Sequence, residues 1–303
     1  KGSHERTPIT LEYEHDAAMR ALAHAQDARR EIVAGALAHA AESWPGEWHA
    51  LTPLPFRFAT WVGYDMDGRT DIKWYTSIRF RLAEKAERLA RYADELEAID
   101  PAHDAAATLR AGSNHAARSA EDFAGDLTEH QALSDAANRL TYDHPDKLVT
   151  LTGIIAELEG QAKDAASENA IALKTLAATM RADGLGMAHI HFRVNAKQLH
   201  NAIRSRLTDA PEIDLASKGA MATLRRKLTE VQPRRTNFAS LAIESSTAVR
   251  QFLAMAQILA HIDADTPIRM LIAECEQPST ILAALSFAKL FGIEDTVDVS
   301  PLF

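Results

Sequence analysis

The sequence predicts a predominantly helical α/β protein in which four short parallel strands are embedded in long helical segments. Alanine is abundant, while proline and glycine occur only 11 and 13 times in 303 residues, a composition that favours long helices. Four segments of strand type are separated by helical patterns. The last two are joined by one helix, a βαβ unit that requires parallel pairing and a right-handed crossover.

The composition is that of an ordinary globular protein. Hydrophobic residues make up 47% and charged residues 25% of the chain. The formal charge of −9 argues against a general nucleic-acid binder, because no basic excess is present to neutralise phosphates. No apolar run approaches the roughly 18 residues of a membrane span, and a single cysteine, Cys275, is typical of a reducing compartment. We therefore expect a soluble, cytoplasmic protein without nucleic-acid or membrane partners.

The first expected element is a long helix over residues 11–42. Thr10 suits its N-cap position, and Trp44-Pro45-Gly46 ends it. The helix also carries three histidines without metal-ligand spacing, which we expect at the surface: His15, His24 and His39.

An aromatic and β-branched run over residues 56–63 is typical of a strand and leads into an acidic turn with Asp65 and Asp67. A calcium loop does not fit this turn. Gly68 comes too early, and Thr76 stands at the twelfth position in place of glutamate. We expect Asp65 and Asp67 to lie at a strand end, where they could line a site.

Helices are expected throughout residues 72–183. In the first, over residues 72–98, apolar residues recur at three- and four-residue spacings, and the Glu, Arg and Lys residues between them are expected to face solvent. Three or four helices follow, of which the clearest covers residues 147–158 with Asp146 as its cap. Breaks between them are suggested by Pro101, Gly112-Ser113, Gly125, Pro145 and Gly160.

Residues 187–194 form the strand on which we place the candidate site. Apolar and polar residues alternate strictly, as a half-buried strand requires: Ile190, Phe192 and Val194 on one face, His189, His191 and Arg193 on the other. A helical pattern begins again at Asn195. Parallel α/β barrels present their catalytic groups at the carboxyl ends of strands, so the position of Arg193 is the one expected for a functional residue.

The rest of the chain supplies more helices and two strands. Helical patterns cover residues 196–207, 215–231 and 246–261, and strand patterns cover residues 267–273 and 296–303. Between these strands, Pro278 suits the first turn of a helix and Gly292 the position after its end. Because parallel sheets are usually covered on both faces, we expect further cover from sequence beyond this chain or from a partner.

Four motifs resemble, in the same order, those of phosphoenolpyruvate carboxylase. Residues 61–68, Trp-Val-Gly-Tyr-Asp-Met-Asp-Gly, resemble the family's W-x-G-G-D-R-D-G-N strand end. Residues 191–196 resemble its D-I-R-Q-E-S strand end, residues 272–280 its strand and turn before a T-P-S-D helix start, and residues 300–303 its P-L-F-E-T strand. The resemblance extends from about residue 56 to residue 303.

The resemblance implies an eight-stranded α/β barrel with large helical insertions, of which this chain would hold four strands. Residues 1–52 would form an N-terminal helix and residues 53–303 a partial barrel, with insertions at residues 72–183 and 196–261. One continuous domain is the alternative. The resemblance also implies a cytoplasmic homo-oligomer, usually a tetramer.

The reaction implied is that of a carbon–carbon lyase, which joins phosphoenolpyruvate to bicarbonate and gives oxaloacetate and phosphate with Mg²⁺ or Mn²⁺. Such a site must hold two anions and stabilise an enolate beside a metal, which calls for arginines and carboxylates at strand ends. Arg193 matches the arginine of the D-I-R motif, which in the family helps bind the substrate phosphate. Asp65, Asp67 and His191 are further candidates for lining the site.

Several residues depart from the family's motifs. Met66 stands in place of arginine, Tyr64 in place of glycine and His191 in place of aspartate. The chain also lacks the H-P-T segment with the catalytic histidine, the glutamate after P-L-F, the S-D-S-x-K-D segment with a metal carboxylate, and the F-H-G-R-G-G loop. We therefore expect no metal ligands and no complete catalytic set in this chain, which alone should be inactive.

Two other interpretations stay open. A non-catalytic helical scaffold or regulatory relative of the family is favoured by Met66 and His191. A metal-binding module could use His189 and His191, although two histidines are too few for a site. Cys275, between two glutamates, is expected to be an unreactive thiol.

Overall fold

A computed structural model describes residues 9–66, 69, 71–207 and 214–303, and it is predominantly helical with one four-stranded sheet. The strands are β1 (Ala59–Thr60), β2 (His189–Asn195), β3 (Ile268–Ala273) and β4 (Val297–Pro301). The helices are α1 (Leu11–Ser43), α2 (Trp74–Ile99), α3 (Asp104–Asp122), α4 (His130–Thr141), α5 (Thr152–Gln161), α6 (Ser167–Asp183), α7 (Ala196–Arg204), α8 (Lys218–Glu230), α9 (Phe238–Ile243), α10 (Thr247–His261) and α11 (Pro278–Leu290), with a 3₁₀ turn, η1, at Trp48–Ala50.

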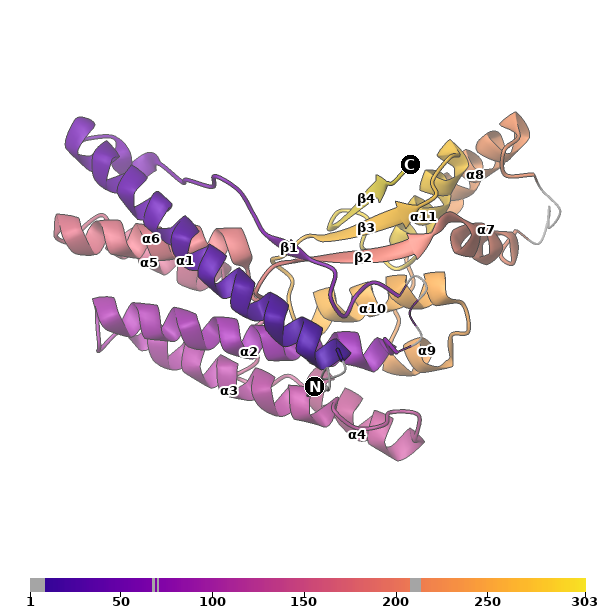
Figure 1. Cartoon of the computed structure of the whole chain (residues 1–303), viewed down its shortest axis with the longest axis horizontal. Helices are drawn as coiled ribbons and strands as arrows, with labels where there is room; N and C mark the ends of the chain where they lie inside the picture. Colours follow the sequence, from indigo (N-terminus) through magenta and orange to yellow (C-terminus); the bar gives the residue numbers. More distant parts are fainter. Residues whose placement is uncertain (1–8, 67–68, 70, 208–213) are drawn as a thin grey trace, which may run out of the picture.

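The sheet is parallel throughout, as predicted, and its strand order is β1-β2-β3-β4, the order of the sequence (Figure 1). β1 is shorter than the predicted strand over residues 56–63, because only Ala59 and Thr60 join the ladder. The chain then turns at Gly63, whose φ of 87° is a conformation that glycine adopts without strain. Pairing resumes at one isolated parallel bridge between Asp65 and Arg193.

The two faces of the sheet differ. Phe192 and Met270, in register on neighbouring strands, belong to the main hydrophobic core together with residues of α7, α10 and α11. The burial of β2 alternates between buried and partly exposed residues along all seven positions, which confirms the predicted alternation. The opposite face carries His191, Arg193 and Arg269, which are partly or largely exposed.

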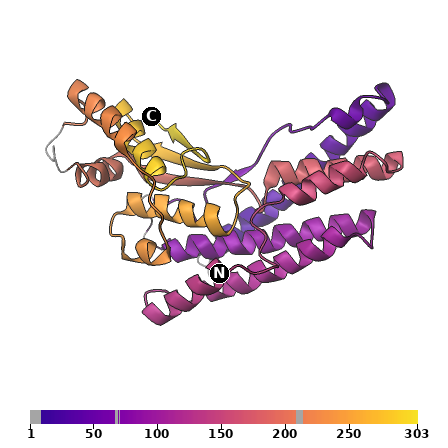
Figure 2. The same ribbon diagram turned by 180° about the vertical axis from the view of Figure 1, so that it is seen from behind.

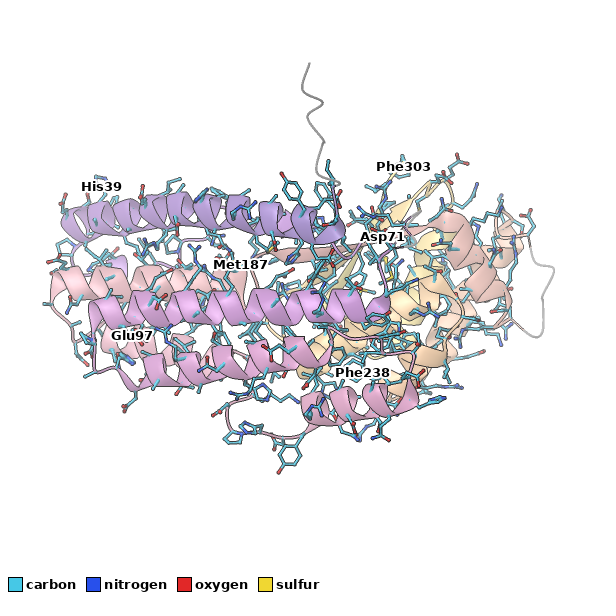
Figure 3. All side chains as sticks on the ribbon, turned by 60° about the horizontal axis from the view of Figure 1, so that its bottom comes forward. His39, Asp71, Glu97, Met187, Phe238 and Phe303 are labelled. Atoms are coloured by element: carbon cyan, nitrogen blue, oxygen red, sulfur yellow. The ribbon has the colours of Figure 1, made fainter. Side chains whose placement is uncertain are left out.

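A second core lies in a helical bundle that extends away from the sheet and contains parts of α1, α2, α3, α5 and α6 (Figures 1 and 2). Met187, just before β2, lies between α1 and α2 in Figure 3 and packs against Met19 and Ala23 of α1. No helix in the described part of the chain is both long and apolar enough to cross a lipid bilayer.

Several predicted boundaries are confirmed and others are wrong. Thr10 caps α1, accepting from the backbone N–H of Tyr13 at 3.2 Å, and α11 begins at Pro278 as predicted. Gly112 does not break a helix. It lies inside α3, where an added Cβ would come within 2.8 Å of Leu148, so the glycine allows close packing.

The predicted helix over residues 147–158 also begins later than expected. α5 starts at Thr152, because the preceding residues are held by contacts outside any helix. The carbonyl of Val149 accepts from the N–H of Ala264 at 2.8 Å, and the carbonyl of Leu148 accepts from Lys85. Asp146 is therefore not its cap.

Candidate functional site

The predicted site residues Arg193 and Asp65 lie together at the carboxyl ends of β2 and β1. Their backbones form the isolated parallel bridge, and Arg193 Nη1 lies 3.7 Å from Asp65 Oδ2. The Arg193 side chain is 43% exposed and that of Asp65 is 18% exposed. A solute can therefore reach this guanidinium, and the neighbouring carboxylate fixes where it lies.

The carboxyl ends of β2 and β3 add two site residues that the sequence did not indicate, Asn195 at the end of β2 and Glu274 just after β3. Asn195 accepts from the N–H of Lys197 at 2.8 Å, which caps α7, and donates through Nδ2 to Glu274 Oε2 at 2.8 Å. Glu274 has a φ of 56°, the only positive φ of a non-glycine residue in the described chain. Left-handed conformations cost an ordinary residue about 1 kcal/mol and are concentrated at functional sites. The carboxyl edge of the sheet thus presents Asp65, Arg193, Asn195 and Glu274 in a row.

His191 lies on the same sheet face as Arg193, two residues earlier on β2. It is in register with Arg269, which approaches Asp298 of β4 at 3.3 Å. Burial, and then the charge of Arg269, lower the pKa of His191, so its imidazole is neutral at pH 7. A neutral ring can donate one hydrogen bond and accept another without adding charge. The remaining predicted residue, Asp67, lies outside the described residues.

Two residues that depart from the family's first motif fill the core and do not line the site. Met66 is 7% exposed and belongs to the main hydrophobic core. Tyr64 is fully buried, with its ring centroid 5.5 Å from that of Phe192, and it donates to Glu84 Oε1 at 2.9 Å. The departures at these two positions therefore affect packing directly.

A buried ionic cluster, which the sequence pattern did not indicate, lies at the opposite, amino-terminal end of the sheet. The prediction that the charged residues of α2 face solvent is wrong for Arg81, Glu84, Lys85 and Arg88, each at most 2% exposed. α2 contacts α3, α6 and α10, so little of its surface remains for solvent. Periodicity alone could not show this, because the partners lie elsewhere in the chain.

Arg81 is the centre of this cluster. It donates to Glu84 Oε2 at 2.9 Å and to the carbonyl oxygen of Ala188 at 3.0 Å, and it pairs with Asp263. Burial favours the neutral form of Glu84, but hydrogen bonding from His15 and the charge of Arg81 outweigh it and hold the pKa of Glu84 below its usual range. Ala188 precedes β2 and Asp263 precedes β3. The contacts of Arg81 therefore hold in place the segments that lead into both strands.

A second group in the cluster joins α1, α2 and α6. Asp183 Oδ2 lies 2.6 Å from Arg29 and 3.1 Å from Arg88. Gln26 accepts from Arg88 at 3.2 Å and donates to the carbonyl oxygen of Met187 at 2.6 Å. These bonds pair buried charges and backbone groups, which would otherwise carry a large desolvation cost.

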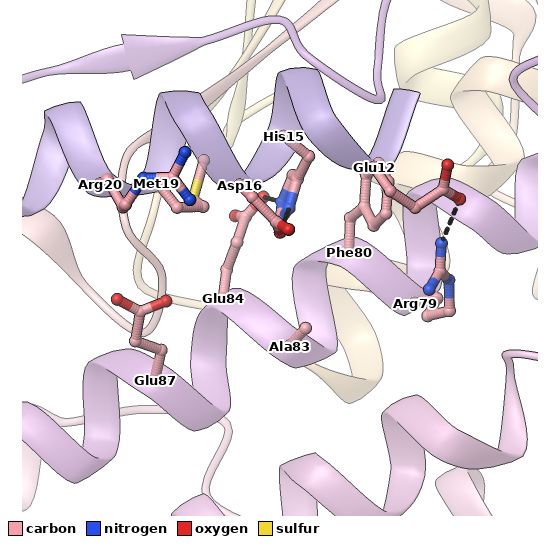
Figure 4. A pocket seen from close by; sticks show the side chains of 10 residues that line it. All are labelled: Glu12, His15, Asp16, Met19, Arg20, Arg79, Phe80, Ala83, Glu84 and Glu87. Carbon is pink, nitrogen blue, oxygen red and sulfur yellow. Dashed lines mark hydrogen bonds and ion pairs between the residues drawn. The ribbon is translucent and has the colours of Figure 1, made fainter. Parts of the chain in front are cut away.

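His15, predicted at the surface, is only 6% exposed and takes part in this cluster (Figure 4). Its Nε2 lies 3.2 Å from Glu84 Oε1, and its ring stacks on Phe80 with centroids 4.0 Å apart. A pocket of about 440 Å³ opens beside it between α1 and α2, where Glu12 and Arg79 pair at 3.1 Å. Since the charged partners are matched to one another, we interpret the arrangement as a cross-link between two helices.

Neither a metal centre nor a nucleophilic cysteine is found within the described ranges. They contain no group of three His, Cys, Asp or Glu side chains placed to hold a metal ion. Cys275 is buried, and burial raises the pKa of its thiol, which disfavours the thiolate.

The candidate site is therefore described by the contacts among its five residues. Arg193 and Asp65 are in contact, His191 shares their sheet face, and Asn195 and Glu274 extend the row to β3. Comparison of the sequence with models of known protein families gave no match, and comparison with curated proteins gave none either.

Proposed function

We propose that this chain forms part of the barrel of an enzyme resembling phosphoenolpyruvate carboxylase, a carbon–carbon lyase, and that Arg193 binds the phosphate of phosphoenolpyruvate. The supporting observation is a fully parallel sheet in sequence order, with Arg193 accessible at its carboxyl edge. Doubly wound α/β sheets reverse their strand order at a switch point, whereas barrel strands follow one another in sequence order. The order β1-β2-β3-β4 is the one that a segment of a barrel requires.

The polar sheet face supports the same proposal. Parallel sheets are usually covered on both faces, and here one face carries the half-buried His191 and Arg193 and the exposed Arg269. In a barrel this face would be the interior, completed by strands from the rest of a full-length enzyme. We propose the homo-oligomeric, cytoplasmic form of the family for that enzyme.

Arg193 has the chemistry that this role needs. Its planar guanidinium can donate two parallel hydrogen bonds to a phosphate, and a dianionic phosphate competes with Asp65 for it. His191, neutral at pH 7, can donate a hydrogen bond to the second anion without repelling the arginine. Asp65 is paired with Arg193 and Glu274 with Asn195, so the described residues do not fit Mg²⁺ or Mn²⁺.

Steady-state kinetics of the full-length gene product test the proposal. The assay contains phosphoenolpyruvate, bicarbonate and Mg²⁺, with oxaloacetate coupled to malate dehydrogenase. We expect Arg193→Met to lower kcat/KM about 10- to 100-fold, the equivalent of losing charge-assisted hydrogen bonds. Arg181→Met is the matched control, because Arg181 is 37% exposed and pairs with Glu159 in the bundle. Absence of turnover with Arg193 intact would refute the enzymatic function.

The burial of Met66 favours one alternative, a non-catalytic scaffold or regulatory relative of the family. A residue that fills the core cannot replace an arginine at the site. A stable full-length protein that neither turns over nor binds phosphoenolpyruvate would support this alternative.

A further inference from the structure

A cavity of about 600 Å³ lies on the helical side of the molecule, between α3, α4 and the segment that follows α4. Its lining includes His115 and Arg118 of α3, and Tyr142 and His144 after α4. None of these residues takes part in the sheet edge or in the buried ionic cluster. The volume is in the range of small-molecule binding sites.

Two histidines face each other in this cavity. The ring centroids of His115 and His144 are 5.1 Å apart, with an angle of 37° between the rings. His144 Nδ1 accepts from the N–H of Asp146 at 3.1 Å, so the neutral ring carries its proton on Nε2 and can donate from there. Among the residues described, the His115 ring has no hydrogen-bond partner.

The charged groups that act most strongly on His115 are basic. After burial, the groups that lower its pKa are His144, Lys85, Arg118 and Lys147. Arg118 is exposed at the cavity and forms no ion pair with any residue that the structure describes. Arg118 is therefore a cation of the lining that is available to an anionic ligand.

The acidic residues nearby form no ion pair with Arg118 in the part of the chain that the structure describes. Asp122 is engaged by Arg139, whose Nε donates to it at 2.8 Å. Asp146 Oδ2 lies 3.8 Å from His144 Nδ1, on the side where that ring is already hydrogen-bonded. Asp143 and Glu121 are exposed, and Asp143 acts on Lys147.

We propose that this cavity binds a small molecule carrying a phosphate group, held by His115, His144 and Arg118. A phosphate offers several acceptor oxygens to a guanidinium and two imidazoles, and it supplies an anionic partner for Arg118. Tyr142 is 68% exposed beside the cavity and presents a ring to the remainder of the ligand. The site is separate from Arg193 and does not depend on the proposed lyase function.

Binding should tighten as the pH falls from 8 to 6.5. A bound dianion stabilises the imidazolium form of His115, so protonation of this ring and binding favour each other. Other charged groups near the two histidines are the same in all variants compared, so they do not account for a difference between variants. They are Lys85, Lys147, Asp143, Asp146 and Glu121.

The test is isothermal titration calorimetry of the whole chain with phenyl phosphate, and with inorganic phosphate as a second probe. We expect Arg118→Gln and the double variant His115→Gln, His144→Gln each to weaken binding of phenyl phosphate about tenfold or more at pH 6.5. His130→Gln, an exposed histidine of α4 away from the lining, should bind as the unaltered chain does. The histidine Cε1–H resonances of His115 and His144 should shift during the titration.

The outcomes separate the sources of the phosphate. Tighter binding of phenyl phosphate than of inorganic phosphate, with the difference removed by Tyr142→Ala, would support a phosphate ester as the ligand. Equal affinity for the two probes would overturn the proposal that the ligand is a phosphate ester. No binding of either probe, or binding that the Arg118 and histidine variants leave unchanged, would overturn the site. Circular dichroism of each variant shows that the fold is retained.

Discussion

The two ends of the parallel sheet use the same residue types for different purposes. At the amino-terminal end, Arg81, Glu84 and Asp263 are at most 1% exposed and bind one another and the backbone. At the carboxyl-terminal end, Arg193 and Asp65 are 3.7 Å apart and partly exposed. Burial, and not residue type, distinguishes a structural ion pair from one that a ligand can reach.

The energetic consequences differ accordingly. Removing one partner of a buried ion pair leaves an uncompensated charge and costs about 3–5 kcal/mol, whereas exposed pairs contribute about 0–1 kcal/mol. In parallel α/β barrels the amino-terminal face supports stability and the carboxyl-terminal face carries the active site. In this molecule the buried ionic cluster lies at the amino-terminal end and the partly exposed pair of Arg193 and Asp65 at the carboxyl-terminal end, and four substitutions can break or sharpen the comparison.

The largest expected effect is that of Arg81→Met. It leaves Glu84 and Asp263 buried without their cation, so we expect the free energy of unfolding in urea to fall by about 3–5 kcal/mol. Arg193→Met, at the other end of the sheet, should lower it by less than about 1 kcal/mol. Similar losses of unfolding free energy for both variants would contradict the proposed difference between the two ends of the sheet.

Gly186→Ala should have the next largest effect. An added Cβ at Gly186 would overlap the guanidinium of Arg81, which cannot move without losing its buried partners. We expect a loss of about 2–3 kcal/mol in urea unfolding. Gly35→Ala in α1 is the matched control, with no atom within 4 Å of its Cβ, and should gain about 1 kcal/mol. No change in the free energy of unfolding for Gly186→Ala would show that the buried ionic cluster rearranges to accept the methyl group.

Lys85 should make stability depend on pH. Burial lowers the pKa of Lys85 to about 7, while in the unfolded chain it stays near 10.5. Between these values the unfolded chain binds more protons, so the free energy of unfolding should rise by about 2 kcal/mol from pH 7 to pH 9.

Urea unfolding of the chain and of Lys85→Met over this pH range checks the prediction. In the variant, the free energy of unfolding should no longer rise from pH 7 to pH 9, whatever its absolute stability. The comparison separates Lys85 from Cys275, whose raised pKa acts in the opposite direction. An equal rise in both proteins would assign the pH dependence to another group.

The smallest effect is expected at Glu274. Glycine tolerates a φ of 56°, so Glu274→Gly should raise the free energy of unfolding by about 0.5–1 kcal/mol, although it removes the hydrogen bond with Asn195. Glu276→Gly, where φ is not positive, should lower it by a similar amount. Destabilisation by both substitutions would show that the conformation of Glu274 is not strained.

Local signals predicted much of this fold. Alternation over β2 located that strand and its faces, and Pro278 and Gly292 marked the two ends of α11. The single βαβ unit already required parallel pairing of β3 and β4. α9, with six residues, is too short to show a helical period and was not predicted.

Long-range partners explain what the sequence could not show. The charged residues of α2 have the spacing of a solvated face, and only their partners Asp183 and Asp263, distant in the chain, show that they are buried. At the site, Arg193 could be predicted from its place near a strand end. The row with Asn195 and Glu274 could not, because it depends on the pairing of β2 with β3 and on one backbone dihedral.

The most direct test of the division between the two ends is phosphoenolpyruvate binding to the full-length protein carrying Arg193→Met, measured by isothermal titration calorimetry beside its thermal unfolding. We expect binding about 10- to 100-fold weaker with little change in Tm. Unchanged affinity in this variant, or a loss of Tm as large as that of Arg81→Met, would contradict the assignment of the carboxyl end to substrate binding.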